Sequence, residues 1–164
     1  MGTTPLVENI AALVDAPAST MDEASWVAAI VAESEAPLLL DLHNLHANAT
    51  NFDFDPCAYL DRIDVRGIGL VHVAGGRLVR RADGRECVLD DHLHAVPLPV
   101  HQLLADLASR ASQPLTVIIE RDGDFPPMRE LLAEIDAVRA ALARGRAARG
   151  GDTDPFRSQQ WRAR

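Results

Sequence analysis

Carboxylates and a histidine stand at the ends of four short apolar segments of this chain. The first segment ends at Glu8, the second at Asp41, the third carries His72 and the fourth ends at Glu120. Carboxylate oxygens and imidazole nitrogens, without thiolates, suit iron, manganese or zinc as ligands. Several carboxylates buried near one another also need a compensating cation, because burial penalises their charged form. The pattern favours a metal site in which these four side chains meet.

A polar run between the third and fourth segments supplies two further candidate ligands. Asp90 and His92 belong to residues 90–94, where four of the five residues are aspartate or histidine. We expect this run to be a connecting loop that brings both side chains to the same site.

Each candidate ligand also has a simpler explanation when it is taken alone. His72 can be a hydrogen-bonded histidine of the core, and Asp90 can be a turn residue. Glu8 can cap the segment that follows it, and Glu120 can belong to a surface charge cluster. The recurrence of such residues at strand ends favours the metal site over these separate explanations.

A metal-free alternative uses Asp41 to orient His43 as a general base for hydrolysis. The chain contains no Gly-x-Ser-x-Gly motif, and neither cysteine lies in the context of a catalytic nucleophile. A nucleophilic hydrolase therefore has little support.

The elements that must position these residues alternate between strands and helices. Buried strands are predicted for residues 5–10, 37–41, 67–76 and 115–120. Helices are predicted after a cap at Thr20, over 56–60, from 99 to 107 and from 128 to 142, and a hairpin over 77–89 that turns at Asp83-Gly84. The polar, asparagine-rich segment 44–55 is predicted to be a loop. This β/α alternation predicts a parallel sheet, whose active site collects at the carboxyl ends of the strands.

The length of 164 residues predicts one globular domain, which we place at residues 1–146. Residues 147–164 are rich in Arg, Gly, Asp and Gln without an apolar period, so we expect a disordered tail. The two cysteines lie far apart, which predicts reduced thiols and a cytoplasmic protein. The N-terminus lacks the layout of a signal peptide, and no apolar stretch approaches the length of a membrane span.

The charge of the chain excludes several classes of partner and enzyme. The formal net charge is −8, with 24 acidic and 16 basic residues, which argues against binding to nucleic acids or anionic membranes. All 16 basic residues are arginine. Without lysine the chain cannot form a Schiff base or complete a P-loop.

The order and spacing of these motifs resemble the DUF692 family of multinuclear non-haem iron-dependent oxidative enzymes, which includes the methanobactin biosynthesis subunit. The resemblance runs from about Pro5 to Leu142. It is carried by the run Leu38–Ala49, Asn51 with Phe54-Asp55-Pro56, Val71–Gly75, Asp90 with His92, and Glu120-Arg121-Asp122 with Phe125-Pro126-Pro127.

The resemblance implies a TIM-barrel fold related to xylose-isomerase-like enzymes, with two or three iron ions at the barrel mouth. It implies oxidation of cysteine or other residues in a ribosomally made precursor peptide with dioxygen, alongside a partner protein that recognises the leader. The implied metal ligands are Glu8, Asp41, His72, Asp90, His92 and Glu120. The side chains expected beside them, as supports or additional ligands, are His43, Asn44, His46 and Asp122.

The chain departs from the resembled family in length, because members carry an additional N-terminal half. We therefore expect an incomplete barrel without its N-terminal strands: a truncated chain, one completed by a separate chain, or a degenerate remnant. An open half-barrel exposes two strand edges, which predicts pairing or poor solubility. The leading function is iron-dependent oxidation of a peptide, and the alternatives are a divalent-metal isomerase or hydrolase and a catalytically inactive half-barrel.

Overall fold

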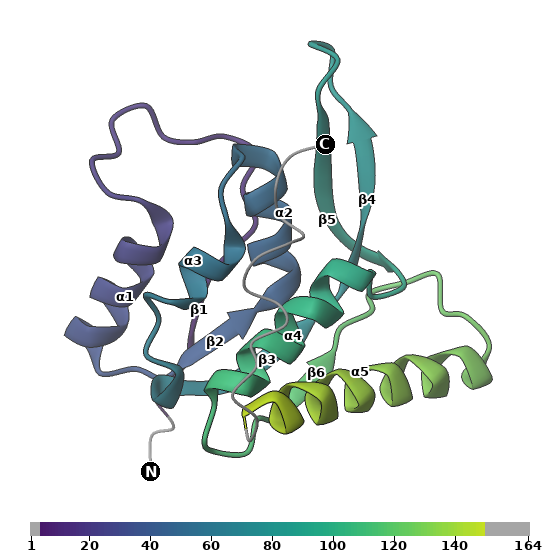
Figure 1. Cartoon of the computed structure of the whole chain (residues 1–164). Helices are drawn as coiled ribbons and strands as arrows, with labels where there is room; N and C mark the ends of the chain where they lie inside the picture. Colours follow the sequence, from purple (N-terminus) through teal and green to yellow (C-terminus); the bar gives the residue numbers. More distant parts are fainter. Residues whose placement is uncertain (1–3, 150–164) are drawn as a thin grey trace.

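The short apolar segments form a four-stranded parallel sheet in the computed structural model, which describes residues 4–149. The strands β1 (Val7–Glu8), β2 (Leu38–Asp41), β3 (Ile68–Val73) and β6 (Val117–Ile119) lie in the order β1-β2-β3-β6 (Figure 1). Each neighbouring pair is parallel. The predicted α/β alternation is confirmed. The described residues form an open sheet rather than a closed barrel.

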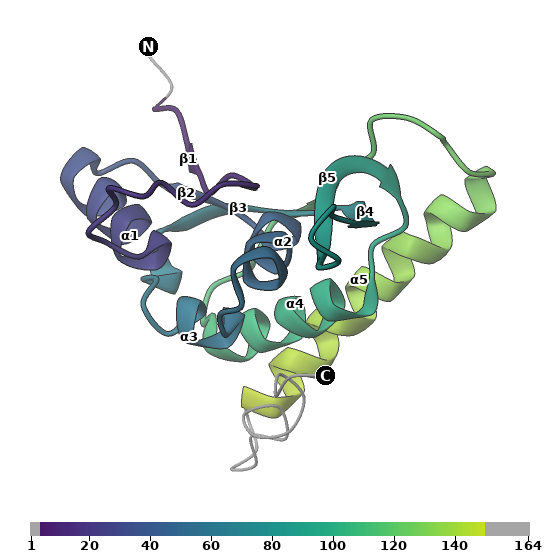
Figure 2. The same cartoon turned by 90° about the horizontal axis from the view of Figure 1, so that it is seen from above.

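The helices of the chain are gathered on one side of this sheet. They are α1 (Glu23–Ser34), α2 (Leu42–Phe52), α3 (Pro56–Leu60), α4 (Leu98–Arg110) and α5 (Met128–Arg149). Figure 2 shows α3 and α4 below the strands and α1 beside them at the left, with α5 packed chiefly on α4. The core lies between sheet and helices, where Leu40, Val71 and Leu104 are fully buried. Gly145 lets α5 approach α4 closely, because a side chain there would meet the carbonyl oxygen of Ala105.

An antiparallel hairpin stands apart from the main sheet, as the sequence predicts. It consists of β4 (Gly75–Arg80) and β5 (Glu86–His94), and Gly84 turns it with a φ of 85°. The prediction of a loop over residues 90–94 is wrong, because β5 continues to His94 and pairs there with Gly75. Asp90 and His92 therefore project from a strand.

The prediction of a loop over residues 44–55 is also wrong, since most of this segment is helix α2. Asparagine disfavours helices because its side chain competes for backbone hydrogen bonds. Here the asparagine side chains bond outside the helix: Asn48 accepts from the backbone N–H of Ala12 at 2.7 Å, and Asn51 accepts from that of Val88 at 2.8 Å. Asp41 caps the helix by accepting from the Asn44 N–H at 2.7 Å.

The first helix begins at a different cap from the predicted one, and the last helix includes the residue at which we placed the end of the domain. The first helix is capped by Asp22, whose side chain accepts from the Ser25 N–H, rather than by Thr20. Helix α5 continues to Arg149, past the predicted domain end at residue 146. The rest of the predicted tail, 150–164, lies outside the described residues. Among the described helices, none is both long and apolar enough to cross a bilayer.

Candidate metal centre

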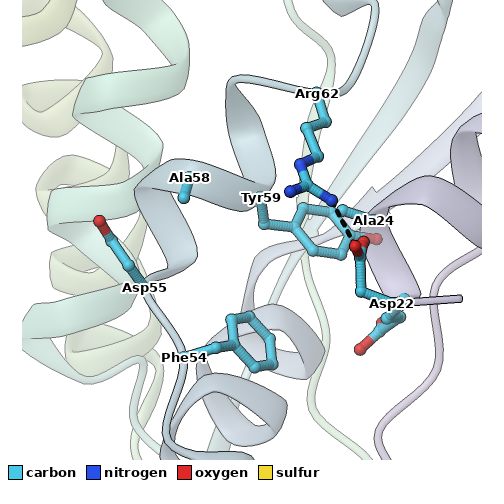
Figure 3. Close-up of a pocket in the computed structure, with 8 residues that line it drawn as sticks. Asp22, Ala24, Phe54, Asp55, Ala58, Tyr59 and Arg62 are labelled. Carbon is cyan, nitrogen blue, oxygen red and sulfur yellow. Dashed lines mark hydrogen bonds and ion pairs between the residues drawn. The ribbon is translucent and has the colours of Figure 1, made fainter.

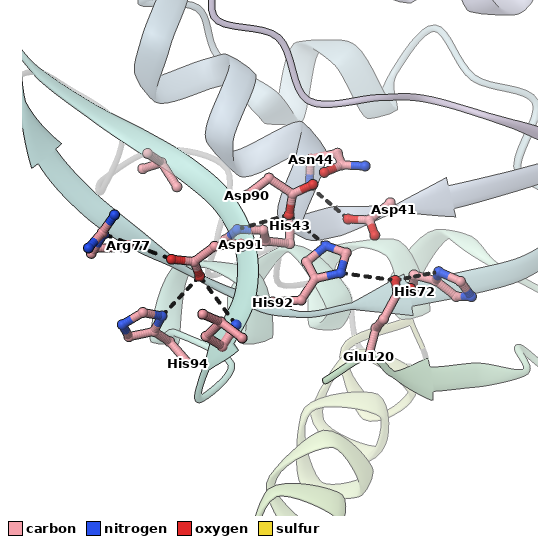
Figure 4. Close-up of polar contacts among 12 residues, drawn as sticks. Asp41, His43, Asn44, His72, Arg77, Asp90, Asp91, His92, His94 and Glu120 are labelled. Carbon is pink, nitrogen blue, oxygen red and sulfur yellow. Dashed lines mark hydrogen bonds and ion pairs between the residues drawn. The ribbon is translucent and has the colours of Figure 1, made fainter. Parts of the chain in front are cut away.

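The strand ends deliver four of the predicted ligands to one edge of the sheet. Glu8 and Asp41 are the last residues of β1 and β2, and His72 is the register partner of Asp41 on β3. Glu120 follows β6 directly, and its backbone N–H donates to the carbonyl oxygen of Val73 at 2.9 Å. Parallel strands thus bring the four side chains together, as the sequence predicts, and Figure 4 shows three of them, Asp41, His72 and Glu120.

The side chains form two groups of metal-ligand spacing that share Asp41. One group is Glu8, Asp41 and His72, and the other is Asp41, His92 and Glu120; in each group one ligand atom per residue lies within 4.8 Å of the others. His72 Nδ1 lies 3.0 Å from Glu120 Oε2 and 3.8 Å from Glu8 Oε1. The cluster therefore has the donors and spacing for two neighbouring cations.

The hairpin brings Asp90 and His92 against this cluster. His92 Nε2 lies 2.7 Å from Asp90 Oδ1, and His92 Nδ1 lies 3.7 Å from Glu120 Oε2 and 3.3 Å from Asp122 Oδ2. His92 has a φ of 53°, in the left-handed region that non-glycine residues rarely occupy. Such a conformation persists only where the surroundings determine it, and here the Asp122 N–H donates to the His92 carbonyl oxygen at 3.0 Å.

Buried polar atoms without a hydrogen bond converge at the same place. Such atoms cost free energy unless a partner or an ion satisfies them. Within the described part of the chain, those at the cluster are Asp41 Oδ2, His72 Nδ1, Asp90 Oδ1, His92 Nε2, Asn44 Oδ1 and both ring nitrogens of His43. Several lie at ion-pair distance from one another without the geometry of a hydrogen bond. The donor set fits iron or another divalent cation bound by oxygen and imidazole.

Burial and neighbouring charges both shift the pKa values of the cluster. It raises the pKa of Asp41 to about 6, although the Asn44 N–H acts against this and the Asp90 carboxylate adds to it. Burial also raises the pKa of Asp90. The pKa of His92 is raised, because the neighbouring carboxylates of Asp90 and Glu120 outweigh its burial. A bound cation would favour the ionised carboxylates and the neutral imidazole.

His43 is the most enclosed of the residues predicted beside the ligands. Its side chain is fully buried, and its Nε2 lies 3.5 Å from Asp90 Oδ1. Burial, with His46 and His92 nearby, lowers the pKa of His43 to about 4, so this imidazole is neutral at physiological pH. Gly76 makes room for the ring, because a Cβ there would collide with His43 Nε2 and the Leu89 carbonyl oxygen.

The other three predicted neighbours surround the cluster at different distances. Asn44 is buried, and its amide donates to the Asn9 carbonyl oxygen at 3.0 Å. The ring of His46 lies one helical turn beyond His43, with 6.2 Å between the ring centroids. Asp122 contacts His92 but is 66% exposed.

Asn9 holds the backbone of Asp41 and was missed by the sequence analysis as a site residue. Its amide donates to the Asp41 carbonyl oxygen and its side-chain oxygen accepts from the Asp41 N–H, both at 2.9 Å. Asn48 and Asn51 likewise hold neighbouring segments. The signal available in the sequence was the spacing of Asn44, Asn48 and Asn51, which places them on one side of a helix.

A separate cavity of about 230 Å³ lies between the start of α1 and α3 (Figure 3). Phe54 and Tyr59 form its aromatic wall, and Arg62 pairs with Asp22 at its rim. None of the candidate ligands lines it. The candidate metal centre is therefore a distinct site at the strand ends.

Fold and cluster together define an α/β protein with a carboxylate and histidine centre at the carboxyl edge of a parallel sheet. The family model described as RiPP precursor modification enzyme MbnB/TglH/ChrH matches residues 1–143, where RiPP denotes a ribosomally made, modified peptide. The chain belongs to this family. The predicted resemblance to the DUF692 family is thereby confirmed.

Curated relatives carry the name UPF0276 protein. One from Bordetella bronchiseptica is 39% identical over 150 residues, covering 90% of this chain and 50% of the relative. One from Streptomyces avermitilis is 44% identical over 136 residues, covering 83% and 27%, and one from Caulobacter vibrioides is 38% identical over 141 residues, covering 86% and 48%. The chain thus spans about half, or less, of the length of these relatives.

Proposed function

We propose that this chain forms the metal-binding part of a non-haem iron enzyme that oxidatively modifies a ribosomally made precursor peptide. The observation that carries the proposal is the convergence, around Asp41, of buried ligand atoms that have no hydrogen bond. Family membership supports the class of substrate, because the family is described as modifying such precursors. The proposed target is a cysteine of the peptide, delivered in the cytoplasm by a leader-recognising partner protein.

The proposed ligands divide between two or three ions. Glu8 and His72 would hold one ion, His92, Glu120 and Asp90 would hold a neighbouring ion, and Asp41 lies within ligand spacing of both groups. Iron would supply the activation of dioxygen and open positions for a substrate thiolate. The residues of the chain fix the donors: Asn9 holds the Asp41 backbone, the Asn44 N–H holds one Asp41 oxygen, and His43 faces Asp90.

A second candidate is a divalent-metal isomerase or hydrolase of the xylose-isomerase-like type. The donor set is compatible with this candidate, because the same oxygen and imidazole ligands also suit manganese and zinc. Consumption of dioxygen in the presence of a cysteine-containing peptide separates the two candidates. The oxidative enzyme consumes dioxygen only when peptide and iron are both present, whereas the isomerase or hydrolase consumes none.

Elemental analysis of the purified chain tests the metal-binding proposal. Asp41→Ala is expected to lose most of the bound iron because Asp41 belongs to both ligand groups, and His72→Ala is expected to lose about half because His72 belongs to one. The matched controls are Asp64→Asn and His94→Ala, which alter residues outside both ligand groups. Iron content that stays unchanged in both ligand variants would exclude this assignment.

A further inference from the structure

The parallel sheet has one uncovered face in the described part of the chain. Parallel sheets are almost always covered on both faces. Here Leu40 and Val71 are fully buried under the helices, whereas their neighbours Leu39 and Leu70, which point to the other face, are only partly buried. On the last strand Ile118 is 44% exposed. In Figure 2 no helix lies directly above β2 and β3, and α1 stands beside the strands at the left.

Among residues 4–149 no further strand pairs with either edge of the sheet, and exposed apolar side chains stand near each edge strand in the sequence. Strand β1 forms one edge and strand β6 the other. The residues beside β1 are Leu6, Ile10, Leu13 and Val14, exposed by 38% to 76%. The residues on and after β6 are Ile118, Phe125, Met128, Leu132 and Ile135, exposed by 37% to 68%. Exposed apolar patches of this kind mark interaction surfaces.

The helices at the two ends of the molecule carry opposite charge. Helix α1 with its two caps holds four carboxylates, Asp22, Glu23, Glu33 and Glu35, and no basic residue, a net charge of −4. Helix α5 holds five arginines and three carboxylates, a net charge of +2. Figures 1 and 2 both place α1 and α5 at opposite ends of the helix layer. One end of the molecule is thus complementary to the other.

We infer that two copies of this chain join head to tail, each placing its β6 edge against the β1 edge of the other. A second copy brings the required parallel edge, and the same contact puts the basic α5 beside the acidic α1. Two such contacts around a twofold axis would join the four strands of each copy into one closed sheet of eight strands. Side chains can fill the interior of a closed sheet of that size. The relatives are about twice as long, which leaves them room for a second half of this size. The inference does not depend on metal binding.

Light scattering coupled to size exclusion tests the pairing with the full chain. The expected mass is twice the 17.8 kDa of one chain. Leu132→Glu on α5 and Ile10→Arg beside β1 are each expected to yield monomers, because each puts a charge into both contacts of the pair. The controls Leu78→Glu and Leu98→Glu change equally exposed apolar residues away from the two edges and should leave the pair intact.

Mixing the two edge variants tests the head-to-tail arrangement itself. The mixed pair contains one unaltered contact and one in which the new glutamate faces the new arginine, so the dimer mass should return. Circular dichroism confirms that each variant is folded. A monomeric wild-type chain, a dimer that survives both substitutions, or a mixture that stays monomeric would overturn the inference. So would a stable complex with a different chain in place of the second copy.

Discussion

The two oxygens of Asp41 have different tasks. One oxygen accepts the Asn44 N–H at 2.7 Å and so caps α2, while the other is buried without a hydrogen-bond partner among the described residues. A single residue thus fixes the start of a helix and presents a carboxylate oxygen to the cluster. This division explains how a strand end can hold a ligand in a fixed orientation before any ion arrives.

Without metal, the contribution of Asp41 to stability should fall as pH rises from about 4 to about 6, against the opposite contribution of the buried His43 imidazole, whose lowered pKa makes stability rise over this range. Burial raises the pKa of Asp41 in the folded state from 3.8 to about 6, so the folded state binds more protons than the unfolded state in this range. The loss at pH 7 should be on the order of 2 kcal/mol. Asp41→Asn keeps a capping side chain, and in urea unfolding the difference in stability between wild type and variant should shrink or change sign as pH rises through this range, because only the wild type loses the Asp41 contribution. A variant with the same pH profile as the wild type would contradict it.

His43→Ala should weaken metal binding roughly tenfold or more, because partners that orient ligand carboxylates contribute on this scale. The imidazole is fully buried, and its Nε2 faces Asp90. Among the described residues, neither ring nitrogen has a hydrogen-bond partner. Metal affinity is measured by competition with a chromophoric chelator. His101→Ala on α4 is the control. Equal metal affinities for the two variants would show that His43 does not support metal binding.

At the scale of elements, the strands could be predicted from the sequence but α2 and the end of β5 could not. Apolar runs with a polar residue at or next to their end mark buried strands, and β2, β3 and β6 follow that pattern. The asparagines of α2 indicated a loop because their partners lie about 35 to 40 residues away in the chain, in 9–12 and in β5. Local propensity cannot reveal partners that only the fold brings together.

The asparagines of α2 should each contribute to stability through these distant contacts. Asn48→Ala leaves the Ala12 N–H and Ile10 carbonyl oxygen without their partner, and should lower the free energy of unfolding by about 1–3 kcal/mol. Thr50→Ala, at an exposed position of the same helix, should change it by less than about 0.5 kcal/mol. Equal effects of the two substitutions would show that the contacts across the fold do not stabilise α2.

At the scale of the whole molecule, the sequence predicted the cluster because parallel strands place their carboxyl ends together. Glu8, Asp41, His72 and Glu120 were all selected from that rule, and the structure brings them together. For the hairpin, the sequence identified Asp90 and His92 as candidate ligands but not the strand that carries them. That strand, β5, depends on pairing with β4.

Asp41 is common to both ligand groups, so iron stoichiometry tests the proposed centre most directly. An anaerobic Fe(II) titration, followed by removal of free metal, gives the iron bound per chain. We predict at least two ions in the wild type, the loss of one in Glu8→Ala, and the loss of both in Asp41→Ala. An Asp41→Ala variant that binds as much iron as the wild type would contradict the account.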